Sequence, residues 1–355
     1  MNLWVLDTDF EQLLYVDAYE SLLWTERFNE YGEFELSSSF NASLYSACKT
    51  GNYVYNSDSE YLMIITDVEI TSDADDGKLL VVSGYSIEYY LTRRIIWDPV
   101  SYDGDFQNAI KDILTKAFIN PDDTNRKVDN FVFDTCSDTA VTDLTIDNEY
   151  TGDNVYTVIK ELCQDERIGF KLIPDYTDKT LHFSLYAGTD RSYEQSDAPY
   201  VVFSPYFDNL ISSEYSASAF GACTISLVAG AGEGTSRKRV EYGNSSKKAL
   251  NRSELYVDAR DISDEDEDSN EIPWSKYKVL LMRRGLKELR DYQSTTTYTG
   301  ETDPKIMFVY GKDFFMGDVV QLVNEFGYEG RSRITELIIS ISPSKQTVMP
   351  TFSAA

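Results

Sequence analysis

Histidine is almost absent from this sequence, and its scarcity narrows the chemistry that the chain can perform. His182 is the single histidine among 355 residues, and it lies in the apolar segment Leu181–Leu185. A Ser-His-Asp triad, a histidine-rich metal site or a Cys–His pair would each need this one residue. The sequence also contains neither a G-x-S-x-G nor an H-E-x-x-H motif. We therefore expect His182 to be a structural or surface residue, and we predict no catalytic residues.

Cysteine is scarce and unpaired. Cys48, Cys136, Cys163 and Cys223 are scattered along the chain without any C-x-x-C spacing. This pattern is typical of reduced, mostly buried cysteines and argues against a zinc site or a disulfide framework. We predict neither metal ligands nor cofactor-binding residues, and we expect no cofactor.

Long hydrophobic runs are also lacking. No segment approaches the roughly 20 apolar residues that a membrane-spanning helix requires. Asn2–Phe10 contains charged residues, and no long apolar stretch follows it, so it does not resemble a signal peptide. We expect synthesis in the cytoplasm, and any extracellular destination would be reached without classical secretion.

Positive charge is in short supply. The chain has 32 lysines and arginines against 60 aspartates and glutamates, which gives a formal net charge of −28. A surface this acidic repels phosphate groups, so stable nucleic-acid binding is not expected. Two interpretations remain open: the charge keeps a soluble protein from associating, or it forms a surface along which nucleic acid slides without sticking.

Two short segments resemble ligand-binding loops without completing them. Gly230–Gly234 is rich in glycine but lacks the order of a phosphate-binding loop, and Glu233 would repel a phosphate. Asp73–Gly77 could be mistaken for a calcium loop, but nothing nearby supplies the remaining oxygen ligands. We expect a hairpin turn there, with a positive φ at Gly77.

The acidic run Ser263–Glu271 begins like an EF-hand. Its aspartates follow the one-three-five spacing of a calcium loop: Asp264, Asp266 and Asp268. Position six is Ser269 where glycine is required, and position twelve is Ser275 where a bidentate glutamate is required. We therefore expect a solvated, disordered acidic loop without specific calcium binding.

Among the features that are present, alternation of apolar and polar residues predicts strands in both outer parts of the chain. In the first part we expect a meander over 2–40, a helix with an Asn41 cap over Asn41–Cys48, strands at Gly51–Tyr55, Tyr61–Thr71 and Lys78–Ser83, and a short helix within Gly84–Ile96. Toward the end we expect strands at Tyr200–Phe203, Arg237–Tyr242 and Leu255–Asp258, a hairpin of Asn209–Ala219 with Ala222–Gly230 turning at Phe220-Gly221, and a helix from Pro273 to about Tyr292.

The middle of the chain has a different pattern. Apolar residues at helical spacing predict amphipathic helices over Asp105–Ile119 and Asn154–Asp165. Short strands are expected at Phe131–Asp134, Phe170–Pro174 and Thr180–Ala187. The segment 97–199 is therefore interpreted as an α+β domain inserted between two β domains.

The C-terminal stretch carries the strongest pattern. Lys305–Tyr310, Asp318–Asn324 and Arg331–Ser342 are rich in β-branched and aromatic residues and are separated by glycines. They predict three antiparallel strands of a small barrel or Greek-key domain.

This stretch resembles the closing barrel of the baseplate hub proteins of long-tailed phages. That family includes the N-terminal part of tail-associated lysins and shares its fold with the hub of the cell-puncturing device of contractile phages. The matching residues are Gly311, Lys312, Asp313, Phe314, Gly317, Asp318, Val320, Arg333, Ile334, Thr335 and Glu336. Three further segments resemble the family in the expected order: Trp24–Leu36 (WTERFNEYGEFEL), Gly84–Ile96 and Asn251–Arg260.

The resemblance implies a mainly β fold with an α+β middle domain and two related antiparallel β-barrels, which form a pseudo-six-fold ring in a homotrimer. The implied domains are 1–96 (first hub barrel), 97–199 (middle domain), 200–345 (second hub barrel with the acidic loop and helix) and a tail, 346–355. The implied role is structural: a virion baseplate hub at the tail tip that joins the tail tube to the tip spike or fibres and surrounds the channel for DNA and the tape measure protein. Implied partners are copies of the chain itself, the tail tube or distal tail protein ring, the tape measure protein, and a spike or fibre protein.

Two other functions remain as alternatives. Tail-associated lysins carry their hydrolase in a C-terminal extension, and we expect no room for one after Ala355. A cell-wall polysaccharide hydrolase would be revealed by zymography on host walls. A receptor-binding tail module would be revealed by a pull-down on host cells, and the aromatic content of 14% suits carbohydrate stacking as well as a core.

Overall fold

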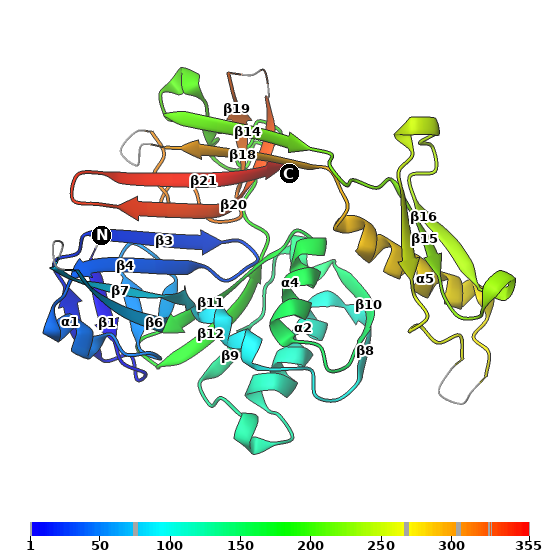
Figure 1. Ribbon diagram of the computed structural model, residues 1–355, viewed down its shortest axis with the longest axis horizontal. Helices are drawn as coiled ribbons and strands as arrows, with labels where there is room; N and C mark the ends of the chain where they lie inside the picture. The colour runs from blue at the N-terminus through cyan, green and yellow to red at the C-terminus, as the bar shows by residue number, and fades with distance from the viewer. Residues whose placement is uncertain are drawn as a thin grey trace. The chain divides into compact units, whose positions relative to one another are not determined.

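One large sheet joins the beginning and the end of the chain, as the computed structural model in Figure 1 shows. The structure describes residues 2–73, 77–265, 270–302, 307–325, 327 and 329–354. The chain divides into two units, Met1–Glu214 with Tyr298–Ala355, and Tyr215–Thr297.

The first part of the chain supplies seven strands to this sheet. They are β1 (Leu3–Leu6), β2 (Gln12–Val16), β3 (Ser21–Arg27), β4 (Glu33–Ser39), β5 (Tyr53–Asn56), β6 (Leu62–Asp73) and β7 (Gly77–Ser86). Helix α1 (Ala42–Ala47) lies between β4 and β5, and the Asn41 side chain accepts hydrogen bonds from the backbone N–H groups of Ser43 and Leu44. The predicted Asn41 cap is therefore confirmed. Gly77 has the expected positive φ, +82°.

The last part of the chain supplies the remaining strands. They are β13 (Val202–Phe203), β14 (Ser212–Ser218), β18 (Thr295–Glu301), β19 (Val319–Val323), β20 (Glu329–Ile341) and β21 (Gln346–Ala354), with the short helix η4 (Pro205–Phe207) after β13. The strands predicted at Asp318–Asn324 and Arg331–Ser342 are confirmed. Residues 346–354, which the sequence pattern leaves outside the second barrel, pair with β20 as strand β21.

Strands β3 and β20 form the seam between the two groups. They pair antiparallel from Glu336 opposite Arg27 to Ile341 opposite Leu22. Because β20 uses one edge for β3 and the other for β21, the two groups share one sheet in place of two separate ones. Among the described residues the strand order runs open from β14 to β2, so the expectation of closed barrels is wrong for these strands.

The middle segment forms the α+β part that the sequence predicts. It contains the short helix η1 (Ile87–Arg93), β8 (Val100–Asp105), α2 (Phe106–Leu114), a π-helical turn η2 (Thr115–Ile119), η3 (Thr124–Arg126), β9 (Phe131–Asp134), α3 (Thr139–Thr142), β10 (Thr145–Tyr150), α4 (Val155–Asp165), β11 (Gly169–Asp175) and β12 (Thr180–Tyr186). Both amphipathic helices are confirmed, and Asp105 and Asn154 cap them. The predicted helix at Gly84–Ile96 forms as a 3-10 helix.

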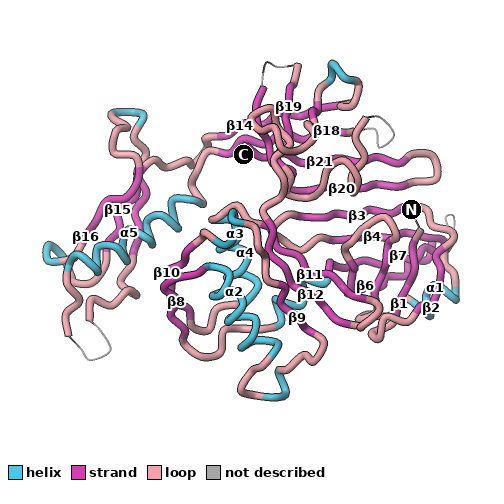
Figure 2. The backbone as a smooth tube through the Cα atoms, turned by 180° about the vertical axis from the view of Figure 1, so that it is seen from behind, coloured by secondary structure: helices cyan, strands magenta, loops and turns pink. Residues whose placement is uncertain are grey.

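Two small sheets flank these helices, β8 with β10 and β9 with β11 and β12. Figure 2 shows α2 and α4 between the two sheets. The buried faces of the helices belong to a hydrophobic core that also contains Leu6, Leu62 and Ile64 of the large sheet. The opposite face of the large sheet packs a separate core with Trp24, Leu337 and Phe352. The middle segment is thus anchored to the N-terminal strands by apolar burial.

The unit Tyr215–Thr297 has its own small core. Strand β15 (Ile225–Ala229) lies between β16 (Arg239–Gly243) and β17 (Glu254–Asp258), and helix α5 (Trp274–Arg290) packs on them through Tyr277 and Leu281. The short helices η5 (Gly234–Ser236) and η6 (Ala249–Asn251) lie in the connecting loops. The predicted strands of this region and the helix from Pro273 are confirmed.

Two strand predictions are wrong. Gly221 does adopt a positive φ of +73°. However, β14 pairs with β18 and β15 pairs with β16 and β17, so Asn209–Ala219 and Ala222–Gly230 form no hairpin. In Lys305–Tyr310, the described residues Met307–Tyr310 form a loop. Alternation within a segment does not identify the strand that pairs with it. Here the pairing with strands that are distant in sequence determines which segments form strands together.

The acidic run Ser263–Glu271 is described only in part. Asp266 and Asp268 lie outside the described residues, and so does Ser269, so the expected disordered loop stays a prediction. Asp264 forms an ion pair with Lys238 at 3.0 Å. Within the described part of the chain, no helix is long and apolar enough to cross a membrane.

Candidate functional site: the joint between the two ends of the chain

Three chain segments that are far apart in sequence meet at one end of the β3–β20 seam. We call this place the joint. It consists of Glu26–Phe28 at the end of β3, Ala187–Arg191 after β12, and Tyr310–Asp318 with Arg333–Glu336 near the C-terminus. All of these residues lie within one unit of the structure.

The Phe28 ring is the centre of the joint. It is buried, and its edge contacts the ring of Tyr186 at a centroid distance of 5.3 Å. Gly169 and Gly317 leave the space for it, because a Cβ atom at either position would come within 2.4 Å or 2.3 Å of the Phe28 ring. The Phe28 backbone N–H donates to Thr335 O, and the Phe170 N–H donates to Phe28 O. The ring and backbone of Phe28 together therefore connect the end of β3 to β11 and to the C-terminal strands.

Arg333 covers the other face of this arrangement. Its guanidinium lies 5.0 Å from the centre of the Phe28 ring. The same Nη1 group donates to Ala187 O at 2.5 Å and to Gly317 O at 2.6 Å. Burial lowers the pKa of Arg333, and the nearby charge of Arg167 acts in the same direction. Such a partly buried guanidinium is well suited to join two backbone segments, since its planar donors have fixed directions.

Asp318 joins the C-terminal part to the end of the middle segment. This carboxylate is 2% exposed and accepts hydrogen bonds from the backbone N–H of Thr189 at 2.7 Å and of Phe315 at 3.0 Å. It also pairs with Arg191 Nε at 2.6 Å. A buried carboxylate is costly unless its oxygens are satisfied, and here three donors satisfy them.

Glu26 lies in a polar cluster on the buried side of the seam. Its carboxylate accepts hydrogen bonds from Trp24 Nε1 at 3.0 Å, from Ser59 Oγ at 2.5 Å and from the hydroxyl of Tyr310. Burial raises the pKa of Glu26, and these hydrogen bonds oppose the change. The donors come from both ends of the chain, so Glu26 connects the N-terminal strands to the C-terminal part.

On the outer side, Arg27 connects the two partner strands. Its guanidinium donates to Glu336 Oε2 and to Glu33 Oε1, both at 2.7 Å, and to Tyr31 O at 3.1 Å. An open groove of about 450 Å³ lies over this side of the joint. Its lining residues are Arg27, Phe28, Asn29, Glu30, Gln164, Arg167, Arg333, Thr335, Glu336, Thr351, Ser353 and Ala354.

The polar groups of the joint hold chain segments together. The described donors and acceptors bind protein groups of three segments, and Glu26, Asp318 and Arg333 are each satisfied by such partners. His182 lies apart on β12, where its ring contacts Thr180 Oγ1 at 2.9 Å and Asp134 at 3.0 Å. No cluster of three or more potential metal ligands occurs in the described part of the chain.

Sequence analysis predicted no functional site here, although it singled out two of the segments that form the joint. The two segments Trp24–Leu36 and Gly311–Glu336, noted for their family resemblance, are brought together by the seam. The contribution of Gly169, Gly188 and Arg191 was missed. Gly188 is needed because a Cβ there would come within 2.1 Å of Gly317 O. The glycine directly after a predicted strand, in the run AGTDR (187–191), was the available signal.

Comparison with known proteins gives a family and a fold. The model of a family described as Siphovirus ReqiPepy6 Gp37-like protein matches residues 2–352. No curated protein matches the sequence.

Three solved structures are similar over almost the whole chain. The prophage MuSo2 43 kDa tail protein from Shewanella oneidensis has a TM-score of 0.61 at 12% identity, with 100% of this chain and 98% of that chain covered. The tail protein from Neisseria meningitidis MC58 has a TM-score of 0.60 at 12% identity, covering 99% and 96%. The prophage tail protein gp18 from Listeria monocytogenes EGD-e has a TM-score of 0.55 at 15% identity, covering 100% and 95%.

Proposed function

The chain belongs to the Siphovirus ReqiPepy6 Gp37-like protein family, and from this premise we propose that it is a structural protein of a phage tail and serves as its baseplate hub. The solved structures of similar fold are described as tail proteins, which supports a place in the virion tail. The hub lies at the tail tip and is a homotrimeric ring. It joins the tail tube to the tip spike or fibres.

The β3–β20 seam is the observation that supports a ring most directly. Two groups of strands from the two ends of the chain lie edge to edge in one sheet and are fixed by the joint. Residues 1–96 and 200–345 are the two related ring segments in this proposal, 97–199 is a peripheral middle domain, and 346–355 completes the second segment. Three chains then supply six segments, which suits a six-fold tube on one side and a three-fold spike or fibre on the other. Ring closure satisfies the head-to-tail contacts of every copy.

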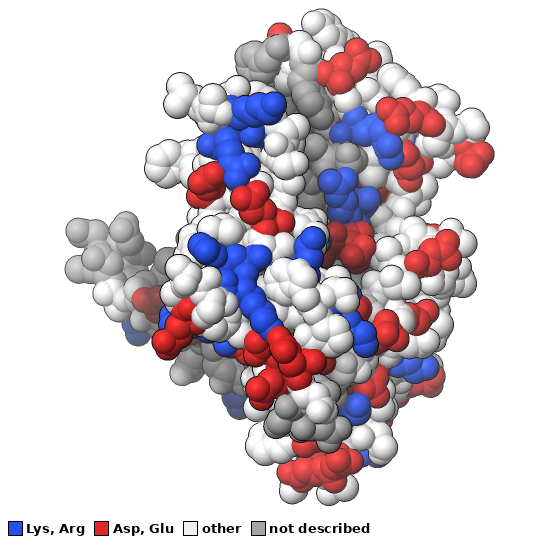
Figure 3. Space-filling view, turned by 90° about the vertical axis from the view of Figure 1, so that its right-hand side faces the viewer, with Lys and Arg blue, Asp and Glu red and all other residues white. Residues whose placement is uncertain are grey.

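The charge of the chain fits a channel for DNA. Three copies carry a formal charge of −84, three times −28. Figure 3 shows acidic and basic side chains interspersed on the face that it draws. In the ring, part of the acid excess faces the channel, where it repels DNA within about 8 Å at physiological salt. The DNA and the tape measure protein pass through without stable binding.

The remaining partners follow from this position. The tail tube or distal tail protein ring contacts one side of the hub, and the spike or fibre protein contacts the other. The hub itself is not an enzyme in this proposal, which the single histidine and the lack of a G-x-S-x-G or H-E-x-x-H motif support.

The mass of the purified chain in solution tests this proposal. Light scattering on the full chain should give three times the chain mass. The joint variant Arg333→Ala should lower the thermal stability, because two backbone carbonyls and the Phe28 ring lose their partner. A monomer or a dimer over a wide range of protein concentration would contradict the ring.

A further inference from the structure

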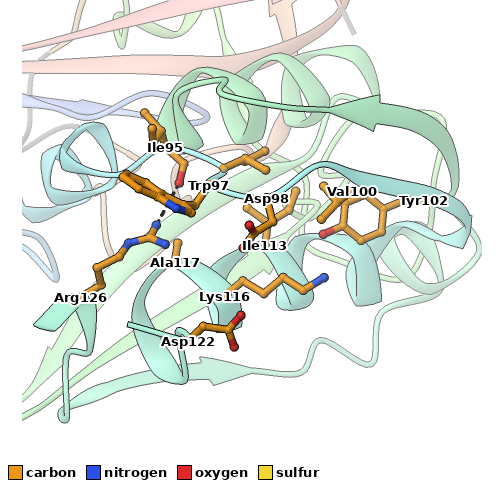
Figure 4. A pocket seen from close by; sticks show the side chains of 11 residues that line it. Ile95, Trp97, Asp98, Val100, Tyr102, Ile113, Lys116, Ala117, Asp122 and Arg126 are labelled. Carbon is orange, nitrogen blue, oxygen red and sulfur yellow. Dashed lines mark hydrogen bonds between the residues drawn. The ribbon is translucent and has the colours of Figure 1, made fainter. Parts of the chain in front are cut away.

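A shallow pocket on the middle segment combines features that the hub role does not use. Figure 4 shows it between the stretch that follows η1, helix α2 with its π-helical turn, and the segment that ends with the short helix η3 at Arg126. Its volume is about 80 Å³. The lining residues are Ile95, Ile96, Trp97, Asp98, Val100, Tyr102, Ile113, Lys116, Ala117, Asp122 and Arg126.

The Trp97 ring forms the rim of this pocket and is 66% exposed. Arg126 lies over one face of the indole at 5.3 Å from the ring centre. Arg126 is held there because its Nη2 group donates to Ile95 O at 3.0 Å. An indole that is fixed in place and open to solvent offers a flat apolar surface at low entropic cost to a ligand.

Three arginines stack on aromatic rings in this region, and one of them, Arg126, lines the pocket. Arg93 lies over Tyr90 at 4.6 Å, Arg94 lies over Phe118 at 5.4 Å, and Arg126 lies over Trp97. Arg94 Nη2 donates to the backbone oxygen of Arg126 at 3.3 Å. Burial lowers the pKa of Arg94, and the positive charges of Arg126 and Arg93 lower it further. The charge of Arg94 is therefore close enough to those of Arg93 and Arg126 to be repelled by both.

These arginines have no carboxylate partner among the described residues, although the chain contains 60 acidic residues. The Nε atom of Arg94 is buried and has no hydrogen-bond partner in the described structure. Like charges held together without a counterion are unfavourable, and an anionic ligand would relieve the repulsion. Charge and an unsatisfied donor thus point to the same kind of ligand.

The pocket also offers hydrogen-bond acceptors. Asp98 and Asp122 are exposed at its edge, while Lys116 and the Tyr102 hydroxyl both bind Asp112. Hydroxyl groups need acceptors as well as donors, whereas a plain anion needs donors alone. A sugar with a negative substituent would use all three features of this region: a flat ring surface, free carboxylates and guanidinium groups.

We propose that this pocket binds an acidic saccharide, a sugar unit that carries a carboxylate or phosphate group. The sugar ring lies on the open face of Trp97, and a substituent fills the 80 Å³ hollow. The acidic group lies against Arg126 and extends toward the neighbouring Arg94 and Arg93. A nucleic acid strand suits the pocket less well, because its many charges are repelled by a chain of net charge −28. An acidic peptide would leave Asp98 and Asp122 without a role. The site is independent of the hub function.

Titration of the full chain with two oligosaccharides of equal length tests this proposal. The probes are a hyaluronan tetrasaccharide, which carries carboxylates, and the neutral chitotetraose; binding is followed by saturation-transfer NMR and tryptophan fluorescence. We expect hyaluronan to bind more tightly, and Trp97→Ala to weaken it at least tenfold. The matched control is Trp274→Ala, which removes another exposed indole and should change nothing.

A second set of variants tests whether binding requires the positive charges. Arg93→Gln, at an exposed position, and Arg126→Gln should each weaken hyaluronan binding severalfold while leaving chitotetraose unchanged. Arg239→Gln, an exposed arginine on β16, is the control. Equal binding of the two sugars, no binding of either sugar, or unchanged binding by Trp97→Ala would overturn the proposal. Tighter Trp97-dependent binding of the oligonucleotide (dT)4 would also overturn it, in favour of a nucleic-acid site.

Discussion

Gly317 is the residue whose replacement tests the joint most sharply. Its φ is +87°, and a Cβ there would come within 2.3 Å of the Phe28 ring. We expect Gly317→Ala to lower the free energy of unfolding by roughly 2–4 kcal/mol, through backbone strain and overpacking together. Urea unfolding measures this loss.

Gly311→Ala is the matched control. Gly311 has a similar φ of +79°, but nothing lies within 4 Å of its added Cβ. Only the backbone strain remains, of about 1 kcal/mol. In a Phe28→Ala background, the cost of Gly317→Ala should fall toward that of the control. An unchanged cost there would show that the loss of stability does not come from the contact with the Phe28 ring.

Near the joint, the ionisation of Glu88 makes the stability of the fold depend on pH. It is buried, accepts a hydrogen bond from the Leu172 N–H at 2.9 Å, and has its pKa raised by burial from 4.5 to about 7. The folded state therefore keeps this proton at pH values where the unfolded state has released it. The resulting stabilisation is complete below pH 4.5 and is lost as the pH rises through 7.

The variant Glu88→Gln should remove this dependence, because a glutamine does not ionise and can still accept from Leu172. Between pH 5 and 8 the wild type should lose up to roughly 3 kcal/mol more stability than the variant. Thermal melting at several pH values measures the difference. Glu69→Gln, at an exposed position on β6, should follow the wild type. Parallel pH profiles of wild type and Glu88→Gln would contradict the assignment.

At the scale of the elements, the seam makes β3 and β20 one cooperative structure. Leu337 is fully buried at the seam opposite Glu26. Leu337→Ala should cost about 2–5 kcal/mol, as is usual for a buried leucine. Hydrogen exchange should accelerate in both strands together. The control Leu23→Ala, at a 39% exposed position on β3, should cost less than about 1 kcal/mol. Faster exchange confined to β20 would mean that the two groups of strands unfold separately.

The elements that were predicted correctly depend on interactions between residues close in sequence. Those that were not predicted depend on pairing between distant segments. The helices at Phe106–Leu114 and Val155–Asp165 depend on a cap and an apolar stripe, and both signals lie within the helix itself. The hairpin expected around Phe220-Gly221 failed because its two strands pair in different sheets. The open sheet was missed for the same reason, since the pairing of β3 with β20 connects residues about 310 positions apart.

The joint was only partly visible in the sequence. Its motif residues, such as Asp318 and Arg333, were singled out by resemblance, but their contacts with Thr189 and Ala187 depend on the tertiary arrangement. The pocket at Trp97 left no pattern in the sequence, because its arginines and aromatic rings come from three separate segments.

At the scale of the whole molecule, we predict that the purified chain has no hydrolytic activity. Host cell walls incubated with the purified chain should remain intact in a zymogram. Clearing of the walls that disappears when one pair of carboxylates is replaced by amides would overturn this expectation. A tail lysin of known activity serves as the positive control.

A three-dimensional reconstruction of the purified assembly by electron microscopy tests the central proposal most directly. The proposal predicts three copies in a closed ring, with six strand-rich segments around a channel. Placing the chain in the density should put Asp and Glu side chains on the channel wall. A single copy, a two-fold dimer, or a channel lined mainly by Lys and Arg would contradict it.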